Sequence, residues 1–546
     1  MKSVLLLQIF CCVIAISTQL EGASVTVDLP FGSIKGYSNG DSWQFYGIPF
    51  AAPPVGDLRW QPPTDFIPWT GSTLDANYPP PACIQNCQLG MPACAANMSE
   101  DCLYLNIFIP ISWTPGSNMT YDVLLFIYGG SFIEGTSGCL LYDSKFFTKF
   151  TDTIIVTFNY RVGALGFLRN PAYNIDGNMG FIDQRVAMQW VNNYISYFGG
   201  NGKITLFGES AGAISVGAHL ASPLSTGLFR NAIVESDPWT IPLRSTINAD
   251  VLGEEFFLEL DCITKRCIFD KTSEEILSAP IIDNINLLDQ PLATLLEKAK
   301  TSAFLPVIIG TTTNEGLLFI ERLNRISPVK GEALYNAMLL FVFPYHFESV
   351  VNTYNSLYGV PTNYVDRLSL IAGDYVFLCP TRKLLATISD GEQYAWGYLW
   401  NRGETYNASS TFCYNIPCHG SELPYVFGTP SLWDQQFTPN DLNLSRQIQT
   451  YWRNMAYSSD PNMGSGGTGV YPAWPRYETR TGVEMFFDEP IGRLSYNYSD
   501  RVCDFLDTIG YDRSDIFGNS SVIRSFLLMV VVAVVLIGLI NSISSY

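Results

Sequence analysis

Residues 203–213 read KITLFGESAGA, and this stretch decides the fold. Four residues of strand character, 204–207, run into a Gly-x-Ser-x-Gly motif, and the small residues of 213–220 predict a helix directly after it. In so tight a strand-to-helix turn the serine takes a strained backbone conformation that exposes its Oγ above the sheet edge, and the flanking glycines leave room for it. The new helix brings unpaired N–H groups and a positive dipole end to the same place. We therefore predict that Ser210 is a nucleophile.

Short apolar runs recur along the chain and alternate with segments of helical character. They lie at residues 123–128, 153–160, 204–207, 232–235, 305–310 and 393–400. This alternation predicts an α/β fold, with a mostly parallel sheet covered by helices on both faces. Residues 183–198 carry one apolar stripe at helical spacing, and 242–300 and 328–374 predict helical segments that cap the sheet.

A serine hydroxyl needs a base within hydrogen-bond reach, and the chain offers three histidines. His219 lies on the helix expected after Ser210 and points away from the turn, so we interpret it as a packed structural residue. His346 stands among aromatic residues in a capping segment, where a structural role is also favoured. His419 lies in a loop after the 393–400 strand, where a sheet of this class presents a base, and we predict that it activates Ser210.

The acid that orients the base is expected between the serine and the histidine in the sequence. Glu315 lies in a turn that directly follows a buried strand. We predict that it holds the imidazole in one tautomer and stabilises the imidazolium that forms during the reaction.

An oxyanion hole needs backbone N–H groups that converge on one point. The strand at 123–128 runs into a Gly-Gly turn that lets the backbone approach closely. We expect the donors to be the N–H groups of Gly130, Ser131 and, just past the nucleophile, Ala211.

The net charge of −19 excludes nucleic acid as a partner, because phosphate neutralisation needs a basic face. The acidic residues form no long run, which indicates a solvated surface. Three scattered histidines do not build a metal site, and a serine nucleophile works without a cofactor, so we predict neither metal nor cofactor.

The first 22 residues are typical of a secretory signal peptide, with Lys2, an apolar run at 4–16 and small residues near a cleavage point. Six glycosylation sequons fit that pathway. They lie at Asn97, Asn118, Asn407, Asn443, Asn497 and Asn519.

The C-terminal segment 519–546 contains an apolar run, 526–540, without a charged or polar side chain. We expect it to attach the protein to a membrane at the cell surface or in the lumen. A spanning helix and a lipid-anchor signal remain equal alternatives, and a buried terminal helix is the third.

Thirteen cysteines, of which Cys11 and Cys12 lie in the signal segment, leave eleven in the rest of the chain. An odd number in an oxidising compartment leaves at least one without a partner in the same chain, and we expect this to be Cys139. Close spacings suggest local loops at Cys262/Cys267 and at Cys413/Cys418.

With these pieces placed, the chain closely resembles the type-B carboxylesterase and cholinesterase family of α/β-hydrolases. The matching stretches are 46–56 with 58–60, 100–106, 128–132, 159–163, 177–180 with 183–185, 207–212, 314–316, and 451–452 through 460–462. The resemblance implies an α/β-hydrolase fold in a single domain, 23–518. It also implies a small-molecule ester as substrate, and it gives Ser210, Glu315 and His419 the same three roles.

The resemblance also implies disulfide bridges and two structural ion pairs. These are Cys83–Cys102, Cys262–Cys267 and Cys379–Cys503, with Arg59 paired to Glu100 and Arg161 paired to Asp183. Cys87 with Cys94 and Cys413 with Cys418 are departures from the family pattern and look like additional bridges.

A further departure concerns the substrate. Cholinesterases stack a quaternary ammonium group on a tryptophan in the loop closed by the first bridge, but no Trp, Tyr or Phe lies between Cys83 and Cys102. We therefore predict a secretory-pathway serine hydrolase that cleaves uncharged carboxylic esters. The alternative is a catalytically silent adhesion or storage protein on the same scaffold.

Overall fold

The computed structural model describes residues 22–87, 94–95, 97–241, 243, 245–278, 290–301, 304–403, 413–429, 437–464 and 469–511. Residues 1–21 of the expected signal peptide, the sequons at Asn407 and Asn519, and the C-terminal segment 519–546 lie outside these ranges. Within them, no helix combines the length and the apolar character that a membrane crossing requires.

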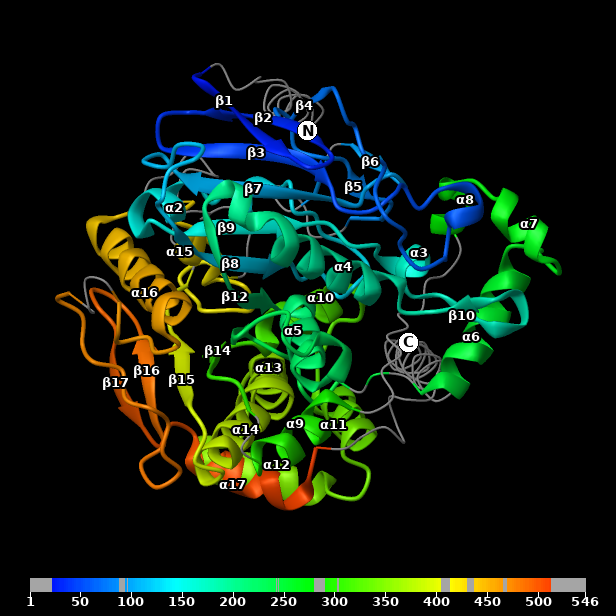
Figure 1. Ribbon diagram of the computed structural model, residues 1–546. Coiled ribbons are helices and arrows are strands. Elements are labelled where there is room, and N and C mark those ends of the chain that lie inside the picture. Colours follow the sequence, from blue (N-terminus) through cyan, green and yellow to red (C-terminus); the bar gives the residue numbers. More distant parts are fainter. Residues whose placement is uncertain are drawn as a thin grey trace, which may run out of the picture.

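The described residues form one sheet of 13 strands, which runs through the whole molecule (Figure 1). The strands are β1 Ser24–Leu29, β2 Gly32–Ser38, β3 Ser42–Pro49, β4 Thr73–Asp75, β7 Tyr104–Pro110, β8 Tyr121–Ile127, β9 Ile154–Phe158, β12 Gly200–Glu209, β13 Asn231–Glu235, β14 Val307–Thr312, β15 Ala395–Trp400, β16 Val483–Phe487 and β17 Arg493–Tyr496. Their order is β1-β2-β3-β7-β9-β8-β12-β13-β14-β15-β16-β17, with β4 paired to β2. Two short pairs lie apart: β5 Ala82–Cys83 with β6 Met98–Ser99, and β10 Arg169–Asn170 with β11 Ile175–Asp176.

The centre of the sheet is parallel and its edges are antiparallel. Every residue of β9, β13, β14 and β15 is buried, as expected for parallel strands covered on both faces. The predicted α/β fold is therefore confirmed. The strand before Ser210 was predicted at 204–207, but β12 is longer and begins at Gly200. Gly200 pairs with Tyr121 of β8, and the register shifts between Gly200 and Ile204.

The helices lie on both faces of the sheet (Figure 1). They are α2 Lys145–Thr151, α3 Gly163–Phe167, α4 Met179–Tyr194, α5 Ala211–Ala221, α6 Thr246–Glu259, α7 Lys265–Asp270, α8 Ser273–Ser278, α9 Pro291–Ala299, α10 Gly316–Ile326, α11 Glu332–Val342, α12 Phe347–Tyr358, α13 Tyr364–Gly373, α14 Cys379–Asp390, α15 Leu423–Phe427, α16 Pro439–Ser458 and α17 Asp500–Ile509. The bounds predicted for α4, 183–198, were wrong by one turn at each end. The helix starts after Asn178, which is in the left-handed region, and 195–198 form a separate 3-10 turn.

Side chains from both layers of helices bond to the sheet or to each other. On one face, Gln184 of α4 donates to Ser215 of α5 over 3.0 Å. From α16, Trp452 donates its indole N–H to the carboxylate of Glu235 in β13, 2.7 Å away. Asn231, in the same strand, donates to a backbone carbonyl of α16 over 2.9 Å. These bonds join α4 to α5 on one side and fix α16 relative to β13, the strand that lies beside β12.

The predicted capping segments are helical, and α11 to α13 pack around a core of their own. Tyr335, Leu339, Val350, Tyr354 and Leu368 are buried in it. This second core lies beside the larger one that surrounds the central strands. It gives the molecule an apolar wall above the carboxyl ends of the strands.

Five disulfides are present among the described cysteines. They join Cys83 to Cys102, Cys87 to Cys94, Cys262 to Cys267, Cys379 to Cys503 and Cys413 to Cys418. Cys139 is buried with a free thiol, as the odd count predicts. The Cys379–Cys503 bridge ties α14 to α17 across 124 residues of sequence.

Arg161 and Asp183 form a buried bidentate ion pair. Nε and Nη2 of Arg161 each donate over 2.8 Å, and the side chains are 4% and 0% exposed. Arg59 and Glu100 also pair, so both ion pairs implied by the family resemblance are formed.

Replacement of the buried arginine, Arg161→Met, should lower the free energy of unfolding by about 3–5 kcal/mol, because it leaves the carboxylate of Asp183 buried without its counter-ion. Lys149→Met is the control, since Lys149 pairs with Asp41 but its side chain is 59% exposed; this change should cost about 0–1 kcal/mol. Chemical denaturation of both variants measures the difference. Equal losses would contradict the prediction.

Candidate active site

The turn between β12 and α5 holds Ser210 in a strained conformation, with φ 56° and ψ −121°. Close backbone packing explains the glycine two residues later: a Cβ at Gly212 would lie 1.9 Å from the carbonyl oxygen of Ile127, at the end of β8. A Cβ at Gly208 would lie 2.7 Å from the carbonyl carbon and oxygen of Gly212. No side chain fits at either position, so the turn lies directly against β8 and Ser210 projects from it.

The structure brings His419 and Glu315 together. Nδ1 of His419 donates to Oε2 of Glu315 over 2.6 Å, and their side chains are 6% and 1% exposed. The other carboxylate oxygen of Glu315 accepts from the backbone N–H of Thr312 over 2.5 Å and from the hydroxyl of Ser236 over 2.6 Å. Glu315 is thus held at the end of β14, and it fixes one edge of the imidazole.

The opposite edge of the imidazole faces the elbow. Nε2 of His419 lies 3.2 Å from Oε1 of Glu209, the residue that immediately precedes Ser210. Within the described part of the chain, this nitrogen has no hydrogen-bond partner, so His419 is not bonded to Ser210 in this conformation. The rings of Phe319 and Phe377 flank the imidazole, with centroids 5.0 and 5.2 Å away.

The turn after β8, which carries the predicted oxyanion donors Gly130 and Ser131, lies beside the elbow. Gly130 has φ 109°, and Ser131 and Phe132 also have positive φ, at 54° and 60°. A Cβ at Gly129 would lie 2.9 Å from Cβ of Ser210, which places this turn against the elbow. The N–H group of Ala211 opens α5, where the first N–H groups of a helix have no intrahelical partner.

The two remaining histidines lie away from this group. His219 is buried, contacts Ser225 and Gln184 over 2.8 and 3.0 Å, and stacks on Phe181. Burial, reinforced by the charge of Arg185, lowers its pKa to about 3. His346 lies at the start of α12. The packing of His219 fits the structural role predicted for it, and His346 is partly buried at the start of α12.

Sequence reasoning missed the acidic residues that surround the predicted three. Glu209 and Glu235 end two neighbouring buried strands, and Glu422 follows His419 by three residues; all are at most 5% exposed. The hydroxyl of Ser236 reaches Glu422 over 3.3 Å as well as Glu315. The sequence did contain a signal for these residues, because a glutamate at the end of a buried, mostly apolar strand is seldom buried without a role.

Electrostatics couple these groups. Burial raises the pKa of Glu209 to about 7; the charge of His419 opposes this shift and that of Glu315 adds to it. Burial also raises the pKa of Glu235 to about 8, against the hydrogen bond from Trp452. For His419, burial favours the neutral ring, but the charges of Glu209 and Glu315 and the hydrogen bond that the ring donates to Glu315 outweigh this effect. The pKa of His419 is therefore raised above its ordinary value.

One group of possible metal ligands lies elsewhere, at Cys87, Cys94 and Glu134. The two sulfurs are joined in a disulfide and are therefore not thiolates. This donor set does not fit a metal ion.

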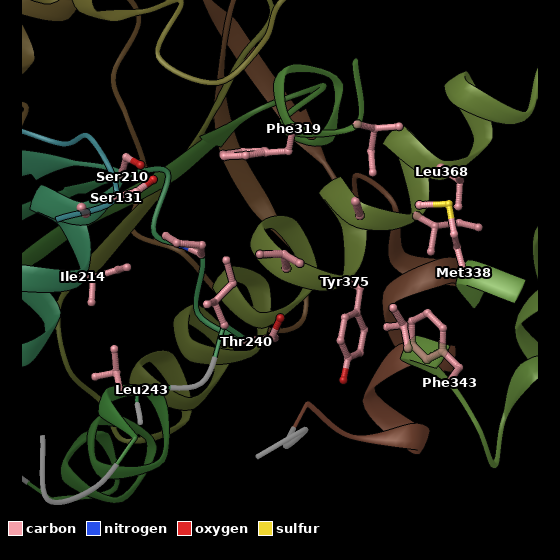
Figure 2. Close-up of a pocket in the computed structure, with 18 of the residues that line it drawn as sticks. Ser131, Ser210, Ile214, Thr240, Leu243, Phe319, Met338, Phe343, Leu368 and Tyr375 are labelled. Atoms are coloured by element: carbon pink, nitrogen blue, oxygen red, sulfur yellow. The ribbon is translucent and has the colours of Figure 1, made fainter. Parts of the chain in front are cut away.

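A cavity of about 500 Å³ opens beside Ser210 (Figure 2). Ser131, Ser210 and Ala211 form one end of its lining, and helices α10, α11 and α13 contribute much of the rest. The size is within the range of small-molecule sites, which runs from roughly 300 to 1,000 Å³. The strained serine, the imidazole-carboxylate pair and an apolar cavity therefore meet at the carboxyl ends of the central strands.

A family model described as the carboxylesterase family matches residues 23–506. The chain belongs to this family. It is 33% identical to the crystal protein of Dictyostelium discoideum, over 88% of this chain and 90% of that protein. It is 32% identical to an acetylcholinesterase of Bungarus fasciatus, over 86% of this chain and 84% of that protein.

A solved structure described as a thermophylic PNB esterase has the same architecture. It superposes with a TM-score of 0.74 and 26% identity, and the match covers 88% of this chain and 99% of the esterase. The family and its esterase members establish that this carboxylesterase is a carboxylic-ester hydrolase with an α/β-hydrolase fold.

The substitution Glu209→Gln should move the acid limb of the pH profile of kcat/KM to lower pH by about one unit. An anion next to an imidazole favours the protonated ring, so its removal lowers the pKa of His419 and leaves the ring neutral at lower pH. Glu484→Gln is the control, because Glu484 is also buried and burial raises its pKa to about 8, but it lies in β16. If the acid limb of the pH profile does not move in Glu209→Gln, the electrostatic coupling between Glu209 and His419 is contradicted.

The Cys413–Cys418 bridge ends next to His419 and packs with Leu317 in a small apolar cluster. Replacing both cysteines by serine should lower kcat by about tenfold or more, since small displacements of a catalytic group are costly. The bridge Cys262–Cys267 spans the same five-residue separation outside this cluster, so its double serine variant is a matched control. Its kcat should stay at the unmodified value.

Proposed function

We propose that this protein is a secretory-pathway serine carboxylesterase that hydrolyses uncharged carboxylic esters through an acyl-enzyme on Ser210. The observation that carries the proposal is the position of His419. Its ring is held by Glu315 on one side and lies against the elbow residue Glu209 on the other, beside an apolar cavity. Acyl transfer requires an acid, a base and a nucleophile in sequence, and this position supports the assignment of the first two, with the residue before Ser210 next to the base.

In the proposed reaction, Oγ of Ser210 attacks the ester carbonyl carbon while Nε2 of His419 accepts the hydroxyl proton. The carbonyl oxygen becomes an oxyanion, which the N–H groups of Gly130, Ser131 and Ala211 stabilise. The tetrahedral intermediate collapses when His419 returns the proton to the leaving alcohol. Water then attacks the acyl-enzyme by the same route, which releases the acid and restores Ser210.

His419 must turn from Glu209 toward Ser210 for the first step. Hydrogen bonds at catalytic sites are often long in the free enzyme and tighten in the complex with substrate. Before the turn, the carboxylate of Glu315 holds Nδ1, and the same carboxylate stabilises the imidazolium that forms in the reaction.

The preference for an uncharged substrate is inferred from the side chains that line the cavity. No charged side chain lines it among the described residues, so a charged substrate group would lose its hydration without gaining a counter-ion. The stretch between Cys83 and Cys102 also lacks an aromatic residue that could hold a quaternary ammonium group. Choline esters are therefore disfavoured.

The five disulfides fit an oxidising compartment. The sequons at Asn97, Asn118 and Asn497 are exposed, as glycosylation requires. Asn443 is partly buried and donates its amide to the carbonyl of Pro490 over 2.8 Å, so a glycan there would displace this bond. We retain the N-terminal signal peptide and the C-terminal membrane attachment as parts of the proposal.

A non-catalytic role is the second candidate, because one similar protein is described as a crystal protein. Labelling with an organophosphate distinguishes the two. An active serine hydrolase takes up one phosphoryl group per chain, on Ser210. Absence of labelling in a folded, pure sample would favour the non-catalytic role.

Ser210→Ala and His419→Ala should each reduce kcat on a simple aryl ester by about 10⁴-fold or more, because the nucleophile and its base act as a unit. The matched control is His346→Ala, which changes a histidine at the start of α12. The control should keep both its activity and its labelling. Undiminished turnover by Ser210→Ala would refute the mechanism.

A further inference from the structure

We propose that the cavity beside Ser210 is a slot for a linear hydrocarbon chain, so that the preferred substrates are esters of long-chain acids or long-chain alcohols. The inference rests on the proposed function. It adds a substrate class and assigns the inner end of the slot to Met338 of α11 and Leu368 of α13.

The first argument is the shape of the cavity. Figure 2 shows Ser210 and Ser131 at one end and Met338, Leu368 and Phe343 at the other. Phe319 and Tyr375 lie between the two ends. The cavity therefore extends from Ser210 toward the capping helices, so that an unbranched chain along this line would pass from Ser210 to Met338; Ile214, Thr240 and Leu243 line a further side of it.

The second argument is the chemistry of the walls. Beyond Ser210 and Ser131, the lining side chains with a polar atom are Thr240 and Tyr375. The hydroxyl of Tyr375 already donates to the backbone carbonyl of Gly510 over 3.1 Å. A hydroxyl or amide in the inner part of the slot would lose its hydration and find few partners, whereas methylene groups lose nothing.

The third argument is the role of Phe319. Its ring lines the slot and also contacts the imidazole of His419, 5.0 Å between centroids, and stacks on Phe377. A chain that fills the slot packs against the same ring that flanks the base. Chain binding therefore excludes water from the side of His419 that faces the cap.

The hydrocarbon chain of the ester does not alter which bonds are made and broken in the reaction. Ser210 still forms the ester bond to the acyl carbon, the alcohol leaves with the proton from His419, and water releases the acid. With a long acid, the chain occupies the slot in the acyl-enzyme; with a long alcohol, it leaves in the first step. The two sources share the same recognition chemistry and differ in which part of the ester shows a length dependence.

The experiment measures kcat/KM for two series of esters on the purified protein, below their micelle concentrations. One is the 4-nitrophenyl esters of linear acids from acetate to palmitate, and the other is the acetates of linear alcohols of the same lengths. In one series kcat/KM should rise by up to about fourfold for each added methylene, the equivalent of about 0.8 kcal/mol per buried group. It should then level off when the slot is full.

Two substitutions at one position test the inner end of the slot. Met338→Trp fills it, so the plateau should move to shorter chains, while Met338→Ala lengthens it and should move the plateau to longer chains. Leu340→Trp is the control on the same helix, because Leu340 is 51% exposed and does not line the cavity; its profile should not change.

The outcomes separate this inference from the proposed function. Activity that falls steadily from the shortest ester in both series, or a plateau that ignores Met338, would overturn the slot while ester hydrolysis at Ser210 stands. If the folded, unmodified protein shows neither organophosphate labelling nor turnover of any ester, the proposed function is overturned instead. A rise in the acid series or in the alcohol series supports the slot and identifies the part of the ester that fills it.

Discussion

The backbone contact between Gly212 and Ile127 is the constraint on which the site depends. A single carbon at position 212 would lie 1.9 Å from the carbonyl oxygen of Ile127, so the first turn of α5 rests directly on the end of β8. Since β8 continues into the Gly129-Gly130 turn, the same contact places this turn beside Ser210. Two strands that are neighbours in a parallel sheet thus bring the proposed nucleophile and the proposed oxyanion donors close together through backbone contacts.

Burial of carboxylates is the second feature that defines the site. Glu209 and Glu315 lie against the imidazole of His419, and Glu235 and Glu422 lie close to them in the same buried region. Burial raises the pKa of Glu209, Glu235 and Glu422 above the ordinary value. Neighbouring side chains hold three of these carboxylates: Ser236 donates to Glu315 and Glu422, and Trp452 of α16 donates to Glu235.

The residues proposed to react with the substrate and the residues proposed to select it lie in different parts of the molecule. The sheet ends carry the residues proposed to make and break bonds, whereas the helices from α10 to α13 build the apolar walls of the cavity around a core of their own. Phe319 belongs to both, since it lines the cavity and contacts His419. A change in the capping helices would therefore reshape the cavity while Ser210, Glu315 and His419 stay in position.

The sequence by itself determined the fold class, the elbow and the identity of the buried strands, because these follow from local patterns: apolar runs, a Gly-x-Ser-x-Gly turn and glycines where backbones touch. With three histidines in the chain, it also singled out His419. The sequence also predicted Glu315 as the partner of the imidazole, but only the tertiary structure decided that Nε2 of His419 faces a second acid, Glu209. The cavity could not be predicted from the sequence either, because its walls come from helices that lie apart in the chain. The physical reason is that these contacts depend on how separate strand ends and helices meet in space, and a sequence pattern records only what lies within a few residues.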